Sequence, residues 1–297
     1  MNNFIIHIGG PTASGKTSLA IEVALLLGTE VVSSDSRQCY KEMSIGTAVP
    51  TKAEQSKVFH HFIHSHSIHS PLTAGSYASE AGHLVSSLLE KYGSAVIVGG
   101  SPLYGDALLY GLDDFPKVDE SILDQLSKQS LEELSHQIKE LDPISAKDID
   151  HQNRRRLERA LSICFQTGKP YSSFKNRKRP KPFENIFEIG IHWERNLLYD
   201  RINSRVDLMF QLGLLAEVQS LIPFKDLKPL QTVGYSELFE YLEGKCSLDE
   251  ATEKIKQHSR NFAKRQLTWY NKKPEFRWFN PGGLNAKEVL DQLSVNY

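Results

Sequence analysis

The chain is poor in cysteine, and its three cysteines stand far apart. Cys39, Cys164 and Cys246 form no CxxC pair among the 297 residues, which argues against a disulfide framework and against a zinc finger. Cysteine usage of this kind is typical of a reducing compartment. We therefore expect a cytoplasmic protein.

Long apolar runs and an excess of one charge are also missing. No stretch comes near the roughly 18 consecutive apolar residues of a membrane span, and the first ten residues carry no basic segment, so neither a span nor a secretory signal is expected. The 35 Lys and Arg against 36 Asp and Glu give a net charge of −1. Any nucleic-acid surface must therefore be a local patch. With 40% hydrophobic residues, the chain is expected to fold as one large or two ordinary globular domains.

Short apolar segments alternate with helical patterns at the start of the chain. We expect strands at 4–8, from Val31, and at 95–98, a helix over 18–27, and a return to the sheet at 187–193. This alternation predicts an α/β fold with a doubly wound parallel sheet. Ligands of such sheets bind beyond the carboxyl ends of the strands. The loops that begin at Gly9, Ser33 and Gly99 should therefore meet in one crevice.

The middle of the chain has a different pattern. Residues 113–188 show helical periodicity without a clear strand, so we expect a helical insertion domain there. The core domain is then formed by residues 1–112 and 189–297, and its last part is mostly amphipathic helix.

A phosphate-binding loop is the most specific motif. The residues GPTASGKT fit G-x-x-x-x-G-K-[ST] and comprise Gly10, Pro11, Thr12, Ala13, Ser14, Gly15, Lys16 and Thr17. In such a loop backbone amides and a helix N-terminus cradle phosphates, the lysine adds a positive charge, and the last hydroxyl can hold Mg²⁺. A chance match in a Gly/Ser-rich turn is disfavoured, because a predicted strand precedes the motif and a predicted helix follows it. The motif predicts a diphosphate or nucleotide ligand without specifying ATP.

A single carboxylate, Asp35, follows the second predicted strand. It is a weak counterpart of the Mg²⁺-binding Asp of NTPases, because the third predicted strand ends in Gly99-Gly100 instead. Asp35 is instead interpreted equally well as a general base or as the cap of the next turn.

Positive charge is concentrated between residues 151 and 181. Only one acid, Glu158, accompanies ten basic residues there: Arg154, Arg155, Arg156, Arg159, Lys169, Lys175, Arg177, Lys178, Arg179 and Lys181. An RNA-binding surface and a solvated helix face are equally compatible with this pattern. Five histidines (His60, His61, His64, His66 and His69) also cluster, and packing roles are favoured over a zinc site because no cysteine is near.

Further blocks follow one another along nearly the whole chain. They are SSDSRQ at 33–38, GTA at 46–48, the histidine pair at 60–61, GGSPLY at 99–104, the segments 155–161 and 205–218, VGY at 233–235 and AKRQLTW at 263–269. Together with GPTASGKT, and in this order, they resemble the bacterial form of the tRNA dimethylallyltransferase (tRNA isopentenyltransferase) family.

The resemblance implies a P-loop NTPase-like core with a helical insertion domain that binds tRNA. It also implies a monomeric, Mg²⁺-dependent enzyme that moves a dimethylallyl group from dimethylallyl diphosphate to the exocyclic N6 amine of an adenosine. That adenosine lies directly 3′ of the anticodon in tRNAs that read codons beginning with U, and diphosphate is released.

Residue roles carry over from the same resemblance. Asp35 positions the amine and accepts its proton, and Lys16, Ser101 and Arg205 contact the diphosphate or the reacting centre. Thr17, with Asp35 as a second candidate, holds Mg²⁺. The implied tRNA-binding residues are Asp35, Ser36, Arg37, Gln38, Ser101, Arg155, Arg156, Arg159, Gln231, Gly234, Tyr235, Lys264, Arg265, Gln266 and Thr268.

Two of the departures of this chain from the family pattern lie in or next to the blocks named above, and others are Phe59 in place of a proline and His64 in place of an acid. Gly-Gly-Thr-Gly-Leu-Tyr is GGSPLY here, so Ser101 keeps the hydroxyl while Pro102 fixes φ and removes an amide. Thr-Trp-Phe-Arg ends in Asn271 here, which removes one cation.

Two other functions remain open on the residues alone. A P-loop kinase of a nucleoside or small metabolite shares the loop, but the missing Asp after the third strand counts against it. A non-catalytic RNA-binding module is disfavoured by the intact Lys16, Thr17 and Asp35.

Overall fold

The computed structural model describes residues 3–175, 182–282 and 284–295. The chain forms two compact units, one made of residues 1–110 and 181–297 and the other of residues 111–180. The sequence prediction started the second part of the core domain at residue 189, which lies inside strand β5 (Ile186–Ile191). In the structure the first unit already includes the residues before β5, since Phe183 and Ile186 pack in its core.

A parallel sheet forms the centre of the first unit. Among the described residues it has six strands in the order β3-β2-β4-β1-β5-β6, and every pair is parallel. Besides β5, the strands are β1 (Phe4–Ile8), β2 (Val31–Ser33), β3 (His60–His61), β4 (Ser94–Val98) and β6 (Arg277–Phe279). The predicted α/β fold and parallel sheet are confirmed, whereas β3 and β6 were not predicted.

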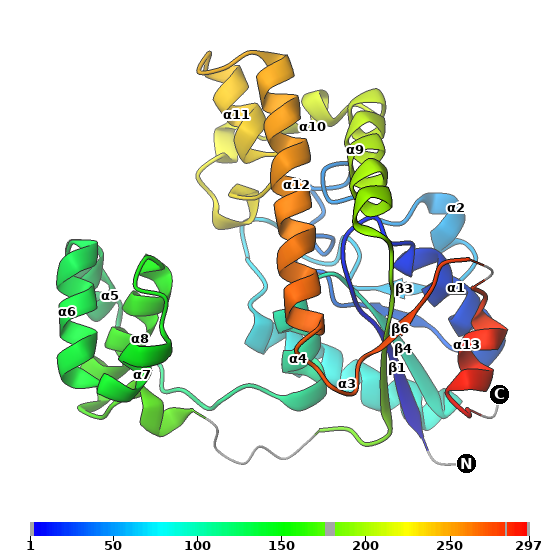
Figure 1. The fold of residues 1–297 in the computed structure, drawn as a ribbon, viewed down its shortest axis with the longest axis horizontal. Coiled ribbons are helices and arrows are strands. Elements are labelled where there is room, and N and C mark those ends of the chain that lie inside the picture. The colour runs from blue at the N-terminus through cyan, green and yellow to red at the C-terminus, as the bar shows by residue number, and fades with distance from the viewer. Residues whose placement is uncertain (1–2, 176–181, 283, 296–297) are drawn as a thin grey trace. The chain divides into compact units, whose positions relative to one another are not determined.

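Both faces of the sheet are covered, which explains why its central strands are mainly apolar rather than alternating. Ile5 and Ile97 pack in one core cluster, and Ile6 and Val96 pack in the other, as the twofold period of a strand requires. Helices α1 (Lys16–Leu27) and α13 (Ala286–Gln292) cover one face, and α3 (Ala74–Tyr92) and α4 (Pro102–Tyr110) cover the other (Figure 1).

Further helices follow β5 in the first unit. They are α9 (Arg195–Gln211), α10 (Leu214–Ser220), α11 (Ser236–Leu242) and α12 (Leu248–Tyr270). A short helix, α2 (Lys52–Gln55), lies earlier in the chain, directly before β3. The long α12 begins at a capping box between Ser247 and Glu250. It packs along α9 (Figure 1) through Ile202 and Ala263. These two helices bring residues far apart in sequence to the same cavity.

In its described part the second unit consists of helices joined by loops. It contains α5 (Glu120–Ser127), α6 (Leu131–Leu141), α7 (Pro143–Asp148) and α8 (Arg154–Thr167). Leu126, Leu134, Ile138, Leu157 and Leu161 form its core. None of the helices in the described ranges is both long and apolar enough to cross a membrane.

Candidate active site

A cavity of about 410 Å³ opens at the carboxyl ends of the central strands. The phosphate loop, the turn after β2 and the loop after β4 all line it, as the sequence predicted. Its remaining walls come from α9, α12, the segments 46–47 and 232–234, and the residues Pro50, His60 and Ile63. The cavity lies entirely within the first unit.

The phosphate loop connects β1 to α1. Gly10 and Gly15 have φ of 125° and 96°, a region in which side chains with a Cβ are strained. The Thr12 amide donates to Oε1 of Gln266 at 2.9 Å, and Nζ of Lys16 donates to the Pro11 carbonyl at 2.5 Å. Thr12, Lys16 and Thr17 face the cavity, so the loop offers a charge, hydroxyls and a helix N-terminus to an anion.

Lys16 lies in an electrostatically unfavourable place for a cation. Desolvation and the positive charge of Arg205 lower the pKa of Lys16 to about 7, although the negative charge of Asp35 acts in the opposite direction. A diphosphate placed beside the ammonium group supplies the missing negative charge and raises that pKa again.

We expect diphosphate binding to take up a proton at Lys16. In the protein without diphosphate, the Lys16 side chain is mostly neutral at pH 8 and mostly charged at pH 6. The number of protons taken up on binding therefore grows, and the affinity for diphosphate falls, as the pH rises through 7. Calorimetric titration with inorganic diphosphate, in buffers of different ionisation enthalpy, measures the uptake. A Lys16→Arg variant is the control, since its cation stays charged while the protons of the diphosphate itself are common to both proteins. Equal uptake by the two proteins would contradict the assignment.

The Asp35 carboxylate has two different oxygens. Oδ1 accepts from the amides of Arg37 at 2.9 Å and Gln38 at 3.4 Å, which is the turn-capping role. Oδ2 lies beside Gly100 and accepts no hydrogen bond from the residues that the structure describes. Asp35 lines the cavity. Its side chain can therefore cap the turn through Oδ1 and interact with a ligand through Oδ2.

Ser101 ties the loop after β4 to this turn. Its Oγ accepts from the Ser36 amide at 2.9 Å and donates to Oγ of Ser36 at 3.0 Å. Pro102 is the first residue of α4, a position where the missing amide has no intrahelical partner to lose and where proline is common. The departure at Pro102 is therefore compatible with the local backbone.

Arg205 and Gln38 are far apart in the sequence, and both line the cavity. Arg205 donates to Oγ1 of Thr12 at 3.5 Å and to the Ala48 carbonyl at 3.4 Å. The Gln38 amide group donates to the carbonyls of Thr47 at 3.2 Å and Ala48 at 3.0 Å. Both amide hydrogens of Gln38 are thus used inside the protein. Its oxygen accepts from the Ser33 hydroxyl at 3.4 Å, which leaves one lone pair of that oxygen for a ligand.

Glu217 fixes another part of the cavity wall. Its carboxylate accepts from the amides of Ser44, Ile45 and Gly46 at 2.8–3.0 Å and from the Tyr235 hydroxyl at 2.7 Å. The Tyr235 ring also packs directly on Gly46. Tyr235 is 0% exposed, so its side chain organises the wall and is not open to RNA.

The other residues implied to bind tRNA fall into three groups. Ser36, Arg37, Gln38, Ser101, Gly234 and Gln266 line the cavity with Asp35. Gln231, Lys264, Arg265 and Thr268 are exposed on the first unit, and Arg155, Arg156 and Arg159 are exposed on α8 of the second unit. Arg177, Lys178, Arg179 and Lys181 lie outside the described residues.

The histidine cluster makes ordinary hydrogen bonds. His61 pairs with Glu30 at 2.6 Å, His64 with Ser44 at 3.0 Å, and His60 with the Val58 carbonyl at 2.8 Å. Within the ranges the structure describes, no three His, Cys, Asp or Glu side chains are arranged to hold a metal ion. The structure therefore favours the packing role over zinc.

Sequence reasoning missed the apolar wall of the cavity. Val206 and Met209 of α9 and Ile255 and Phe262 of α12 supply it. Their helical spacing, together with Ser259 and Gln266 on the same face of α12, was a usable signal. In the sequence alone, however, this face of α12 looks the same as a helix face that packs on the hydrophobic core, because the neighbours of α12 are unknown.

Comparison with known proteins gives consistent matches along the chain. The family model for IPP transferase matches residues 38–273. A tRNA dimethylallyltransferase of Christiangramia forsetii is 49% identical over 99% of this chain and 98% of its own. The tRNA dimethylallyltransferase 2 of Parabacteroides distasonis is 42% identical over 96% and 97% of the two chains.

Solved structures agree with these matches. The tRNA isopentenylpyrophosphate transferase of Bacillus halodurans superposes with a TM-score of 0.72 at 33% identity, covering 99% of this chain and 95% of the other. A eukaryotic dimethylallyltransferase acting on tRNA gives a TM-score of 0.83 over 97% and 77% of the chains. At 23% identity, the second likeness concerns the fold.

Proposed function

The chain belongs to the tRNA dimethylallyltransferase family, and we propose that its cavity holds dimethylallyl diphosphate and alkylates an adenosine of tRNA. The acceptor is the N6 amine of the adenosine directly 3′ of the anticodon, in tRNAs that read codons beginning with U. We place the reaction in the cytoplasm and in a monomer.

The observation that carries the proposal is that a phosphate loop and a lone carboxylate line the same cavity. Lys16 and Arg205 lie at the end that suits the diphosphate, and Asp35 lies beside Gly100. Apolar side chains such as Met209 and Phe262 offer the dimethylallyl group a surface that excludes water. This combination suits transfer of a hydrocarbon from a diphosphate better than it suits phosphoryl transfer.

The reaction then divides among these groups. The allylic C–O bond breaks and its electron pair leaves with the diphosphate, where Lys16, Arg205 and the loop amides stabilise the growing negative charge. A bond forms between the dimethylallyl carbon and N6 of the adenine. The N6 proton passes to Oδ2 of Asp35, which is the oxygen not used by the turn.

The donor set in the cavity fits Mg²⁺. Mg²⁺ usually binds through one or two carboxylates together with substrate phosphates and several waters. Asp35 is the carboxylate on the described cavity wall, and the Thr17 hydroxyl faces the same space. When bound there, the ion supplies positive charge to the leaving diphosphate.

Two exposed basic surfaces suit the RNA. On α8 of the second unit, Arg155, Arg156 and Arg159 lie on one exposed side, and Arg159 stacks over the Phe115 ring at 5.3 Å. On α12, Lys264 and Arg265 are exposed. Such cations attract phosphates and position the RNA, while the target base must leave its stack to enter the cavity.

We expect the α8 arginines to set the salt dependence of tRNA binding. A triple Arg155→Gln, Arg156→Gln, Arg159→Gln variant should lower the slope of log K against log salt by about one for each RNA phosphate that an arginine no longer neutralises. Filter binding at several salt concentrations measures the slope. The matched control changes Lys128, Lys139 and Lys147, exposed lysines of the same unit, to glutamine. Equal slopes for the two triple variants would contradict this RNA surface.

The proposed function is tested by incubating the purified protein with labelled dimethylallyl diphosphate, Mg²⁺ and an unmodified tRNA transcript. We expect label on the adenosine next to the anticodon and release of diphosphate. A transcript with guanosine at that position is the control and should remain unlabelled. Hydrolysis of ATP without label transfer would instead support a kinase, and retention of RNA with neither activity would support a binding module.

A further inference from the structure

Gln266 differs from its neighbours in the AKRQLTW segment by being buried. It is 2% exposed, whereas Lys264, Arg265 and Thr268 are exposed on the other side of α12. Its resemblance-based role as a tRNA contact requires a polar group that RNA can reach. The structure instead buries this amide, and its Oε1 and Nε2 each make a hydrogen bond inside the protein.

The two ends of the Gln266 amide reach opposite walls of the cavity. Oε1 accepts from the Thr12 amide of the phosphate loop at 2.9 Å, and Nε2 donates to the Gly100 carbonyl of the loop after β4 at 2.5 Å. The approach to Gly100 is close enough that a Cβ there would lie 2.5 Å from Nε2 and 3.8 Å from Oδ2 of Asp35. One side chain therefore spans from the phosphate loop to the vicinity of Asp35.

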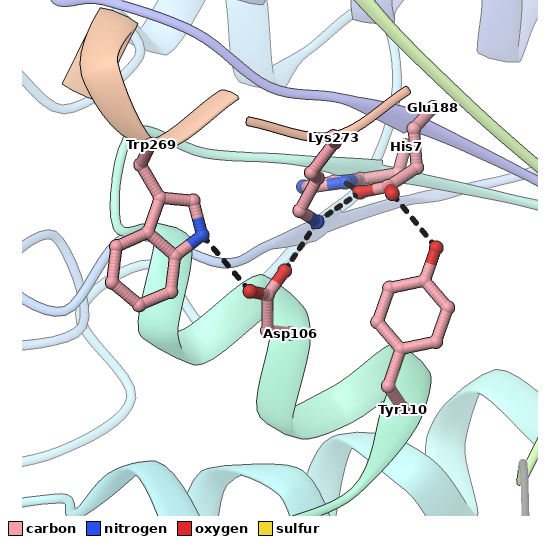
Figure 2. Close-up of polar contacts among 6 residues, drawn as sticks. All are labelled: His7, Asp106, Tyr110, Glu188, Trp269 and Lys273. Carbon is pink, nitrogen blue, oxygen red and sulfur yellow. Dashed lines mark hydrogen bonds and ion pairs between the residues drawn. The ribbon is translucent and has the colours of Figure 1, made fainter. Parts of the chain in front are cut away.

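The C-terminal end of α12 is anchored by a separate polar network (Figure 2). Nε1 of Trp269 donates to Asp106 of α4 at 2.9 Å. In the turn after α12, Lys273 pairs with Asp106 and, at 2.8 Å, with Glu188 of β5. Glu188 also bonds His7 of β1 at 2.9 Å and Tyr110 of α4 at 2.7 Å.

The Glu188 carboxylate of this network remains ionised across the neutral range. Burial alone raises the pKa of Glu188, but hydrogen bonds and positive charge from His7 and Lys273 lower it to about 2. The carboxylate is therefore charged and holds Lys273 firmly. Since Trp269 and Tyr270 follow Gln266 by three and four residues on the same face of α12, the anchor also fixes where Gln266 lies.

We propose that Gln266 is a positioning residue that does not contact tRNA. It sets the separation between the phosphate loop, which holds the diphosphate, and the loop after β4, which lies next to Asp35 and the incoming adenine. The inference rests on the proposed function, because these two loops hold the two reactants. A change in their separation misaligns the dimethylallyl carbon and the adenine amine without altering the outer RNA surface. A misplacement of about 1 Å can cost on the order of 10²-fold in rate.

The test compares Gln266→Met with the wild type in single-turnover transfer at saturating tRNA and dimethylallyl diphosphate. We expect the rate constant to fall about 10- to 100-fold, with the tRNA Kd unchanged within about twofold. Gln257→Met is the matched control, since Gln257 is exposed on the same helix. Lys264→Ala, at an exposed cation of the same helix, is expected to weaken tRNA binding and so shows what loss of an RNA contact does to the Kd. A Gln266→Met variant that weakens tRNA binding and keeps the saturated rate would overturn the proposal.

A Gln266→Glu variant tests the two hydrogen bonds themselves. An ionised glutamate accepts from Thr12 but cannot donate to Gly100, whereas a protonated one does both. The rate of this variant relative to wild type should therefore rise as the pH falls from 8 to 5.5, and a constant ratio would overturn the proposal. If circular dichroism shows that Gln266→Met does not fold, the pH dependence of Gln266→Glu alone tests the positioning role of Gln266. Failure of the wild type to transfer label would instead count against the proposed function.

Discussion

Replacing Asp35 by asparagine is expected to lower the single-turnover rate of transfer by about 10²- to 10⁴-fold, the contribution typical of a positioned general base. Asparagine keeps an oxygen for the amides of Arg37 and Gln38, so the turn and the fold should persist. What it loses is the oxygen beside Gly100 that accepts the N6 proton. The substitution thus separates the chemical role of the carboxylate from its capping role.

The measurement is rapid-quench transfer of labelled dimethylallyl groups at saturating tRNA, with diphosphate affinity measured in parallel. Asp150→Asn is the matched control, because Asp150 caps its own turn through the Gln152 amide at 3.0 Å and lies in the other unit. That variant should transfer at the wild-type rate. If Asp35→Asn did the same, Asp35 would be left with its cap alone.

Local signals predicted much of the sheet. The strands β1, β2, β4 and β5 are mainly apolar, as buried parallel strands usually are, although His7 and Glu188 interrupt β1 and β5. In contrast, β3 consists of His60 and His61, and β6 consists of Arg277, Trp278 and Phe279. Both lie at the edges of the sheet, where pairing with one neighbour, rather than composition, makes a short segment a strand. That information is tertiary.

The candidate site divides in the same way. The phosphate loop and Asp35 are recognised from a motif and from their place after strands, because their chemistry is local. Glu217 lies in one of the family blocks but no role was predicted for it, since a carboxylate that accepts three backbone amides looks in the sequence like any acid of an amphipathic helix. Gln266 had a usable sign, because it sits between Ala263 and Tyr270 at the spacing of a buried helical stripe.

The second large effect is expected at Lys16. Methionine at this position keeps most of the side-chain volume and removes the charge, so the fold should persist while the leaving diphosphate loses a cation that lies in a poorly solvated place. Loss of one preorganised charge-stabilising group typically costs about 10²- to 10³-fold in rate. We expect a fall of that size in single-turnover transfer, together with weaker diphosphate binding and loss of the proton uptake assigned to Lys16.

The size of this effect depends on where the lysine lies. Arg205 is close enough to lower the pKa of Lys16 and is itself on the cavity wall, so it can supply part of the missing charge but not at the position of Nζ. Lys57→Met is the matched control, because Lys57 is exposed and lies off the described cavity wall. Turnover by Lys16→Met equal to that of Lys57→Met would mean that the loop amides and Arg205 suffice. In that case burial and Arg205 would still lower the pKa of Lys16, but Lys16 would have no role in expelling diphosphate.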